Sequence, residues 1–324
     1  MDESLPHVNK GKPSWRCVDW STAKANDRFL KGKNRYDPYI YDFVIATNGV
    51  YMPDEQLDLK KDNRPCVFRG LGKSPHIKEC IKNNIDYMYI DTGYFGNEIT
   101  KIWHRVAYNN LQTLHHLQLF EVQQRIKDHL KRIDARYWLE DRFKDVHGVD
   151  FNKWKPYQAK RGKTILVVPP SQKVFNHFGG SAEKFTNDLI EEIKSYTDRP
   201  IEIRPKVGRD QRTKYTVQDQ LKSGKYHCIV TYNSIASLEA ITVGIPAVVT
   251  GPNAGSYLSE KNLKQIDRPY YPNMKDLKSH IYFLTMCQLK STEFRVAEAY
   301  NVIKALQGDV KPNNDLWRMK KGLM

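Results

Sequence analysis

The sequence has 324 residues and a net charge of +15, from 52 Lys and Arg residues against 37 Asp and Glu residues. With 40% hydrophobic and 11% aromatic residues it is too apolar for a disordered chain, yet no apolar run reaches the roughly 18–20 residues that span a bilayer. The cysteines lack CxxC spacing and the N-terminus lacks a signal-peptide core, so we expect a cytoplasmic, monomeric protein without a disulfide framework or structural zinc.

In the N-terminal half, short apolar runs end at turn residues, which is typical of strands and helices of a small α/β domain. The predicted elements of this half are, in chain order, a helix at Ser21–Leu30, strands at Tyr41–Thr47 and Pro65–Arg69, a helix at Pro75–Asn84, a strand at Tyr87–Ile90 and a helix at Leu111–Arg132. A polar, Lys-rich stretch at residues 149–163 follows. We place the domain boundary there, with an N-terminal domain of residues 1–155 and a C-terminal domain of residues 156–324.

From residue 163 onward, strands and helices alternate regularly. The predicted elements are a strand at Thr164–Val168, a helix at Ala182–Tyr196, a strand at Ile201–Arg204, a helix at Val217–Lys222, a strand at Cys228–Thr231, a helix at Ser234–Val243, a strand at Ala247–Thr250 and a helical tail at Met274–Leu306. Such alternation implies right-handed βαβ crossovers and a parallel sheet. Ligands of such sheets bind at the carboxyl ends of the strands.

One stretch of the C-terminal half combines several features of a ligand site. A predicted strand ends at Thr231, small hydroxyl residues open a helix near Ser234, and Glu239 lies in its second turn. The free backbone N–H groups at the start of a helix suit phosphate, and Ser234 could cap that helix. Gly244-Ile245-Pro246 then returns the chain directly into the next strand. The alternative is a capped core helix with an exposed glutamate.

This pattern resembles the nucleotide-binding half of GT-B glycosyltransferases, in particular the capsule and lipopolysaccharide types, over roughly residues 163–260. The resemblance implies an α/β, GT-B-like fold of two Rossmann-like domains facing a central cleft. It also implies that Glu239 binds the donor ribose and that the helix start at Ser234 and Ser237 faces the diphosphate. Nucleotide-sugar 2-epimerases share this half-domain, so the resemblance specifies the donor class better than the reaction.

Further residues are expected at the donor site. Cations follow the strand that ends at Arg204, and Arg pairs with phosphate bidentately. The alternatives are a solvated basic loop for the cations after Arg204, a plain surface loop for the segment after Pro169-Pro170, and a tight turn for Gly70–Gly72. The expected donor-binding residues are Ser171, Arg204, Lys206, Arg209, Ser234, Ser237, Glu239, Gly70 and Gly72.

Asp91 is the predicted catalytic base, because it ends a buried strand and inverting transfer needs a carboxylate that deprotonates the acceptor hydroxyl. A turn or helix cap is the alternative role, and Glu98 is the reserve candidate. No Asp-x-Asp pair occurs, so we expect chemistry without an obligatory metal. The residues expected to bind the acceptor are Tyr94, Asn97, Lys101, Trp103 and Arg105.

The basic charge favours a polyanionic acceptor, such as nucleic acid or an anionic surface, over a merely soluble basic protein. The compact N-terminal half is similar to phage DNA glucosyltransferases, which modify 5-hydroxymethyl pyrimidines. That resemblance implies transfer from UDP-glucose or another UDP-sugar to DNA, with the base flipped out of the stack. The alternatives are a surface polysaccharide or teichoic-type glycosyltransferase at the inner membrane and a non-catalytic nucleic-acid-binding protein.

Overall fold

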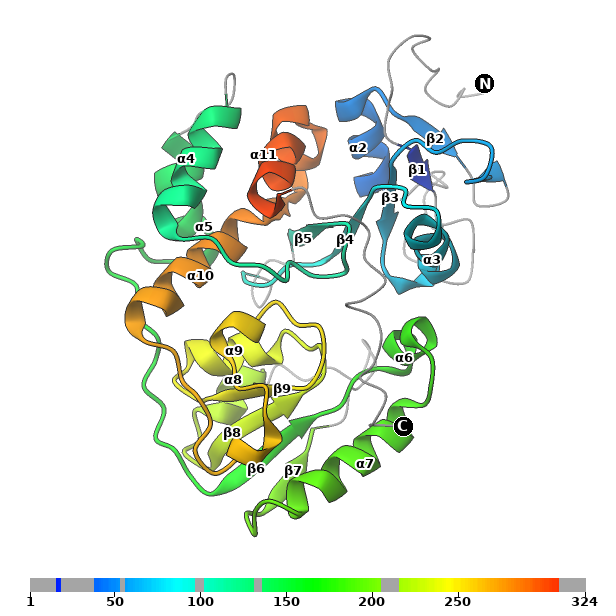
Figure 1. The fold of residues 1–324 in the computed structure, drawn as a ribbon. Coiled ribbons are helices and arrows are strands. Elements are labelled where there is room, and N and C mark those ends of the chain that lie inside the picture. The colour runs from blue at the N-terminus through cyan, green and yellow to red at the C-terminus, as the bar shows by residue number, and fades with distance from the viewer. Residues whose placement is uncertain are drawn as a thin grey trace. The chain divides into compact units, whose positions relative to one another are not determined.

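The computed structural model describes residues 16–18, 38–52, 56–96, 102–130, 136–204 and 216–308. The chain forms two compact units, each assembled from separate stretches (Figure 1). Unit 1 contains the described residues of 1–111, 123–139 and 286–314, and unit 2 those of 112–122 and 140–285. Each unit has one β-sheet with flanking helices, which confirms the predicted α/β class.

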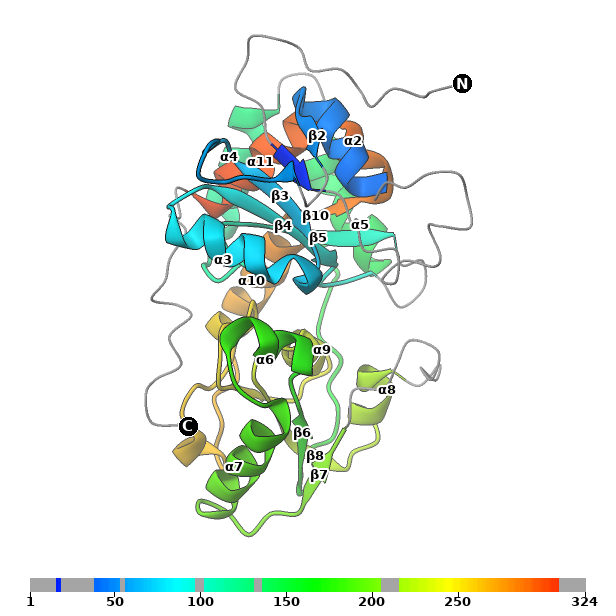
Figure 2. The same cartoon turned by 90° about the vertical axis from the view of Figure 1, so that its right-hand side faces the viewer.

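Unit 1 is built on a six-stranded mixed sheet with the strand order β10-β5-β4-β3-β1-β2. Its elements are β1 (Arg16–Val18), α2 (Pro38–Thr47), β2 (Val50–Met52), β3 (Cys66–Arg69), η3 (Leu71–Lys73), α3 (Ser74–Lys82), β4 (Tyr87–Thr92), β5 (Trp103–Tyr108), β10 (Gln288–Lys290), η7 (Ser291–Arg295) and α11 (Ala297–Gln307). Strands β3 and β4 run parallel, whereas β5 is antiparallel to both β4 and β10. Figure 2 shows α2 and α3 on opposite sides of this sheet.

The run Tyr41–Thr47 was predicted as a strand, and this prediction is wrong, because these residues belong to α2. A short run of mainly apolar residues does not distinguish a buried strand from a buried helix by periodicity. The structure uses the helical spacing, with Ile40, Phe43 and Val44 fully or almost fully buried. The helix ends where Asn48 adopts a left-handed conformation (φ 52°).

Two other predicted helices are shorter than expected. Residues 111–118 form neither helix nor strand, and only α4 (Leu119–His129) of the predicted Leu111–Arg132 is helical within the described residues. The helical tail is interrupted, because β10 and η7 separate α10 (Met274–Met286) from α11. Trp103 and Arg105, two of the expected acceptor-binding residues, lie on β5. The predicted helix Ser21–Leu30 lies outside the described residues.

Unit 2 is built on a four-stranded, all-parallel sheet with the order β7-β6-β8-β9. Its elements are α5 (Arg142–His147), β6 (Thr164–Val168), α6 (Gln172–Phe178), α7 (Ala182–Lys194), β7 (Ile201–Ile203), α8 (Val217–Leu221), β8 (Tyr226–Thr231), α9 (Ala236–Thr242), β9 (Ala247–Val249), η5 (Ser256–Leu258) and η6 (Leu263–Gln265). The helices that run across the divisions between the units are α4, η4 (Tyr137–Asp141) and α10. The parallel sheet predicted for the C-terminal half is therefore confirmed.

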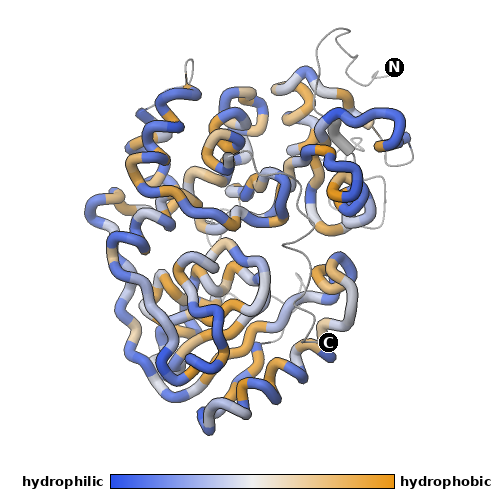
Figure 3. The backbone as a smooth tube through the Cα atoms, in the orientation of Figure 1, coloured by the Kyte–Doolittle hydropathy of each residue, from blue (hydrophilic) through white to orange (hydrophobic). Residues whose placement is uncertain are grey.

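The core of unit 2 explains why the sequence predicts its elements well. Figure 3 shows apolar residues gathered along β6 and β8, and a mixture of apolar and polar residues along α7. Strand β8 is buried at every position, as expected for a central parallel strand, while α7 buries only the face carrying Phe185, Leu189 and Ile193.

The segment after Ser171 was predicted as a loop, but it forms α6. Its apolar residues, including Phe175, pack against α7.

None of the helices in the described ranges has the length and apolar character that crossing a membrane requires.

Candidate functional site

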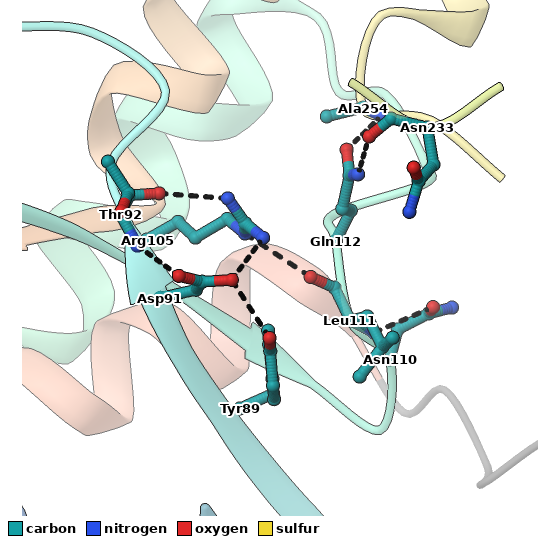
Figure 4. Close-up of polar contacts among 9 residues, drawn as sticks. All are labelled: Tyr89, Asp91, Thr92, Arg105, Asn110, Leu111, Gln112, Asn233 and Ala254. Atoms are coloured by element: carbon teal, nitrogen blue, oxygen red, sulfur yellow. Dashed lines mark hydrogen bonds and ion pairs between the residues drawn. The ribbon is translucent and has the colours of Figure 1, made fainter. Parts of the chain in front are cut away.

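Asp91 lies at the carboxyl end of β4, and its carboxylate is held at both oxygens (Figure 4). Oδ2 accepts hydrogen bonds from the Tyr89 hydroxyl (2.9 Å) and from Arg105 Nη2 (2.9 Å), and Oδ1 accepts one from the Thr92 backbone N–H (2.8 Å). The Asp91 side chain is 36% exposed.

Arg105 was predicted to bind an acceptor, and in the structure its guanidinium pairs with Asp91, the predicted base. It stands directly opposite Asp91 in the antiparallel register of β4 and β5 and is 9% exposed. Besides the bond to Asp91, Nη1 donates to the Thr92 carbonyl (2.9 Å) and Nε to the Leu111 carbonyl (3.3 Å). Burial alone would lower the pKa of Arg105, but the Asp91 charge raises it above its ordinary value. The cation therefore stays charged beside the carboxylate.

Of the other predicted acceptor residues, the two that the structure describes, Tyr94 and Trp103, are buried. Trp103 is 2% exposed, and Gly96 lies so close over its ring that an added Cβ would meet the indole at 2.6 Å. Tyr94 is also buried, and its backbone N–H donates to Gln288 Oε1 (2.9 Å). The Gln288 amide, which no sequence pattern marks, therefore anchors the loop after β4. Asn97 and Lys101 lie outside the described residues, as does the reserve base Glu98.

Gly70 and Gly72 follow β3 in unit 1. Gly70 has φ 72°, a conformation that favours glycine, and Gly72 lies in η3. The neighbouring Arg69 guanidinium lies 4.2 Å from the centre of the Tyr39 ring and 3.5 Å from His104 Nε2. Burial and the Arg69 charge lower the pKa of His104 to about 4. At the carboxyl end of β3, beside Gly70, the Arg69 cation therefore lies next to the neutral imidazole of His104.

In unit 2 the four strands end at one level of the sheet. The Arg204 N–H donates to the Val167 carbonyl (2.9 Å), the Thr231 hydroxyl to the Val168 carbonyl (2.9 Å), and the Thr250 N–H to the Thr231 carbonyl (3.0 Å). The residues that follow β7, β6, β8 and β9 thus share the carboxyl edge, where ligands of parallel sheets bind. We call residues 232–235 the β8 loop and residues 250–255 the β9 loop.

The two loops are locked together by Asn253, which is fully buried. Its Nδ2 donates to the Ser234 carbonyl (3.0 Å), and its Oδ1 accepts from the Ser237 hydroxyl (2.8 Å) and the Gly255 N–H (2.8 Å). Ser237 is likewise fully buried, so its hydroxyl serves this lock. Ser234 and Glu239 are partly exposed. Of the predicted donor-binding residues, Ser234 and Ser237 are brought together directly.

Gln112 makes a second connection between the same loops (Figure 4). Its Nε2 donates to the Asn233 carbonyl in the β8 loop (2.6 Å), and its Oε1 accepts from the Ala254 N–H in the β9 loop (2.8 Å). Gln112 is 4% exposed. The sequence analysis missed both Gln112 and Asn253, because each acts on loops that are distant in sequence.

Arg204 follows β7 and is held by a chain of polar side chains. Its Nη1 donates to Gln220 Oε1. Gln220 Nε2 donates to Glu202 Oε1 (2.9 Å) and to the Tyr226 hydroxyl (2.7 Å), and Lys225 pairs with the other oxygen of Glu202. Because both N–H groups of Gln220 have acceptors, its carbonyl oxygen is the end that faces the guanidinium. This series of hydrogen bonds holds the Arg204 cation at the carboxyl edge.

Ser171, Lys206 and Arg209 are also predicted donor residues. Ser171 is partly exposed and precedes the first residue of α6. Lys206 and Arg209 lie outside the described residues. Within the described ranges, no three His, Cys, Asp or Glu side chains come together as a metal site would require.

No protein-family model matches the sequence, and no curated protein sequence matches it. Among solved structures, the chain is similar to KpsC of Thermosulfurimonas dismutans, described as a beta Kdo 2,4 transferase, with 12% identity, a TM-score of 0.45 and coverage of 92% of this chain and 99% of that chain. It is also similar to the beta Kdo 2,7 transferase of the same organism's KpsC, with 12% identity, a TM-score of 0.42 and coverage of 82% and 89%. The proposal that follows is based on the residues of this chain.

Proposed function

We propose that the protein is a glycosyltransferase that binds a nucleotide-activated sugar at the carboxyl edge of the unit 2 sheet and transfers the sugar to a hydroxyl of an anionic glycan. One observation carries the proposal. At the edge where ligands of parallel sheets bind, Asn253 and Gln112 lock the β8 and β9 loops, and Gln220 holds a cation, Arg204, where the chain leaves β7 at the same edge. Fixed loops and a fixed cation are what a diphosphate leaving group requires, since they stabilise charge without reorganising.

The donor residues then have separate roles. Arg204, joined by Lys206 and Arg209, neutralises the diphosphate, because a guanidinium pairs with two phosphate oxygens at once. Ser234 and Ser171 donate hydrogen bonds to the phosphates, and Gly70 and Gly72 let the backbone approach the donor. Glu239, half-buried on α9, accepts hydrogen bonds from the ribose hydroxyls. No metal is needed to neutralise the leaving group in this scheme.

Asp91 is the proposed general base of an inverting transfer. Its carboxylate is paired with the Arg105 guanidinium and is partly exposed. It removes the proton of the acceptor hydroxyl while that oxygen forms the new bond to the anomeric carbon and the nucleotide departs with the electron pair of the broken bond.

An anionic glycan is the acceptor class that we favour over DNA. The net charge of +15 suits either polyanion. A flipped base, however, needs accessible aromatic and cationic side chains, and Tyr94, Trp103 and Arg105 are all buried. A surface polysaccharide that carries carboxylate or phosphate groups accounts for the charge without requiring those three side chains.

Acceptor-dependent release of the nucleotide tests this proposal. UDP-, GDP- and CMP-activated sugars, including activated Kdo, would be incubated with anionic polysaccharides, with DNA containing 5-hydroxymethylcytosine, and with unmodified DNA. We expect release of one nucleotide with a polysaccharide acceptor. Release only with hydroxymethylated DNA would assign the acceptor to DNA instead. A protein that neither binds nor turns over any nucleotide sugar would overturn the glycosyltransferase assignment.

A further inference from the structure

Residues 112–118 are the first segment of unit 2. One of their side chains, that of Gln112, contacts both the β8 loop and the β9 loop at the carboxyl edge. Gln112 spans 121 positions in sequence to reach the Asn233 carbonyl and 142 positions to reach the Ala254 N–H. It therefore joins the β8 loop to the β9 loop independently of Asn253. Both ends of its amide are used, one as a donor and one as an acceptor, so only this side-chain orientation satisfies both loops.

The backbone on either side of Gln112 is itself fixed, which aims the side chain. Immediately before it, the Leu111 carbonyl accepts from Arg105 Nε (3.3 Å) and the Leu111 N–H donates to Asn110 Oδ1 (2.9 Å), as Figure 4 shows. Farther along, the Leu117 carbonyl accepts from the Ser279 hydroxyl (3.2 Å). A long, flexible side chain held in a single orientation loses rotamer freedom, and its two buried hydrogen bonds offset that cost.

The β9 loop receives a further contact from the same segment. His116 and His280 approach each other with their Nδ1 atoms 3.0 Å apart, and His280 Nε2 hydrogen-bonds to the Ala254 carbonyl (2.7 Å). The Ala254 peptide is thus held at its N–H by Gln112 and, through its carbonyl, by His280. Residues 112–118 therefore hold the β9 loop at two points. They hold the β8 loop at one point, the hydrogen bond from Gln112 to the Asn233 carbonyl.

From these contacts we propose that Gln112 is a positioning residue for the donor site. It sets the spacing between the β8 loop, which carries Ser234, and the β9 loop. This inference rests on the proposed function for its effect on donor affinity, but its structural part concerns the loops alone. Loss of the Gln112 bonds should loosen the loops and weaken donor binding without removing any group that contacts the reacting atoms.

Two substitutions separate the bonds. Gln112→Met keeps the length of the side chain and removes both bonds, whereas Gln112→Glu keeps an acceptor for the Ala254 N–H and turns a second oxygen toward the Asn233 carbonyl. Hydrogen exchange of the ligand-free protein reads out loop order. We expect faster exchange in both loops for Gln112→Met, and chiefly in the β8 loop for Gln112→Glu. With the donor sugar identified by nucleotide release, KM for the donor should rise about tenfold while kcat changes less than about threefold.

Gln307 provides a matched control in unit 1. It is 2% exposed, accepts from the Tyr108 N–H (2.8 Å) and donates to the Val106 carbonyl (2.6 Å), so Gln307→Met removes the same kinds of bond from a buried glutamine. This variant should lower the midpoint of unfolding to a similar extent and leave both the exchange of the β8 and β9 loops and the donor KM unchanged.

The outcomes distinguish the inference from the proposed function. Unchanged exchange in both loops of Gln112→Met would overturn the inference, as would an equal rise in donor KM for Gln307→Met. If the wild-type protein binds no nucleotide sugar, the proposed function fails, and the exchange experiment alone decides whether Gln112 positions the loops.

Discussion

Arg105 faces Asp91 across the antiparallel pair of β4 and β5, and its guanidinium donates to the carboxylate at 2.9 Å while remaining 9% exposed. The predicted base therefore has a permanent counter-charge. A carboxylate that shares a site with a cation stays ionised near neutral pH, and the hydrogen bonds from Tyr89 and Thr92 fix its orientation.

The first prediction concerns Asp91. Asp91→Asn should lower kcat about 100-fold or more, since a general base contributes on that order, and should change donor KM little. It should also lower the free energy of unfolding by about 1–3 kcal/mol, because Arg105 loses its counter-charge. Steady-state kinetics and urea unfolding measure the two effects.

Tyr89→Phe is the control for this prediction, because it removes one hydrogen bond to Asp91 and leaves the carboxylate and its cation in place. We expect a fall in kcat of less than about tenfold. An Asp91→Asn protein with a kcat within threefold of the wild type would rule out the assigned role.

The second prediction concerns Glu239. Glu239→Ala should raise donor KM by about 10–100-fold through loss of charge-assisted hydrogen bonds to the ribose, with a smaller effect on kcat. Glu183, in the first turn of α7 and exposed, supplies a matched glutamate whose replacement by Ala should leave donor KM unchanged. Equal, mild losses from Glu239→Ala and Asp91→Ala would contradict both assignments.

The elements of unit 2 could be predicted from the sequence because its strands are central and its helices amphipathic. The period of the apolar residues then identifies each element, as for β8 and α7. In unit 1 the same reasoning failed for α2, whose apolar residues follow one another without a clear period. It also failed for residues 111–118, which are not helical and make contacts distant in sequence, such as that of Gln112 with Asn233.

The third prediction concerns Gly244, which returns the chain to β9. It has φ +83°, and an added Cβ would approach the Tyr157 carbonyl oxygen at 2.6 Å. Gly244→Ala should therefore cost about 1–2 kcal/mol for the backbone conformation and about 1–3 kcal/mol more for the contact. Urea unfolding of the variant measures the total.

Gly148 separates these two contributions, because it has φ +72° and an added Cβ would meet no atom within 4 Å. Gly148→Ala should show the conformational cost alone. If the two variants lose the same stability, the close approach of Tyr157 has no energetic effect.

The fourth prediction concerns pH. Burial lowers the pKa of His280 to about 3, against the opposing effect of the Ala254 carbonyl, from an ordinary value of 6.5. Between these values the unfolded chain binds a proton that the folded protein does not. The free energy of unfolding should therefore fall as the pH decreases from 6.5 toward 3, by up to about 1.4 kcal/mol per pH unit for this residue. Urea unfolding at pH 5 and pH 7.5 measures the difference.

His280→Gln should reduce that difference, whereas His129→Gln, at an exposed position on α4, should leave it unchanged. An equal dependence on pH in the wild type and in His280→Gln would show that His280 is not responsible.

The candidate site was predictable only where a residue directly follows a strand. Asp91, Arg204 and Ser234 could be singled out because each stands at the carboxyl end of a predicted strand, where ligands bind. The buried amide side chains that hold the neighbouring loops in place carried no such signal. Gln288, Gln112 and Asn253 act on backbone groups that only the fold brings near, and no local pattern marks a buried amide side chain.

Hydrogen exchange with and without nucleotide tests the central claim, that the carboxyl edge of the unit 2 sheet binds the nucleotide of a sugar donor. The wild-type protein would be examined alone and with UDP, GDP or CMP, alongside Glu239→Ala. We predict that one nucleotide slows exchange in residues 232–239 and 250–255 of the wild type and has less effect in the variant. Nucleotide binding that leaves both segments unchanged, or no binding of any of the three nucleotides, would contradict the account.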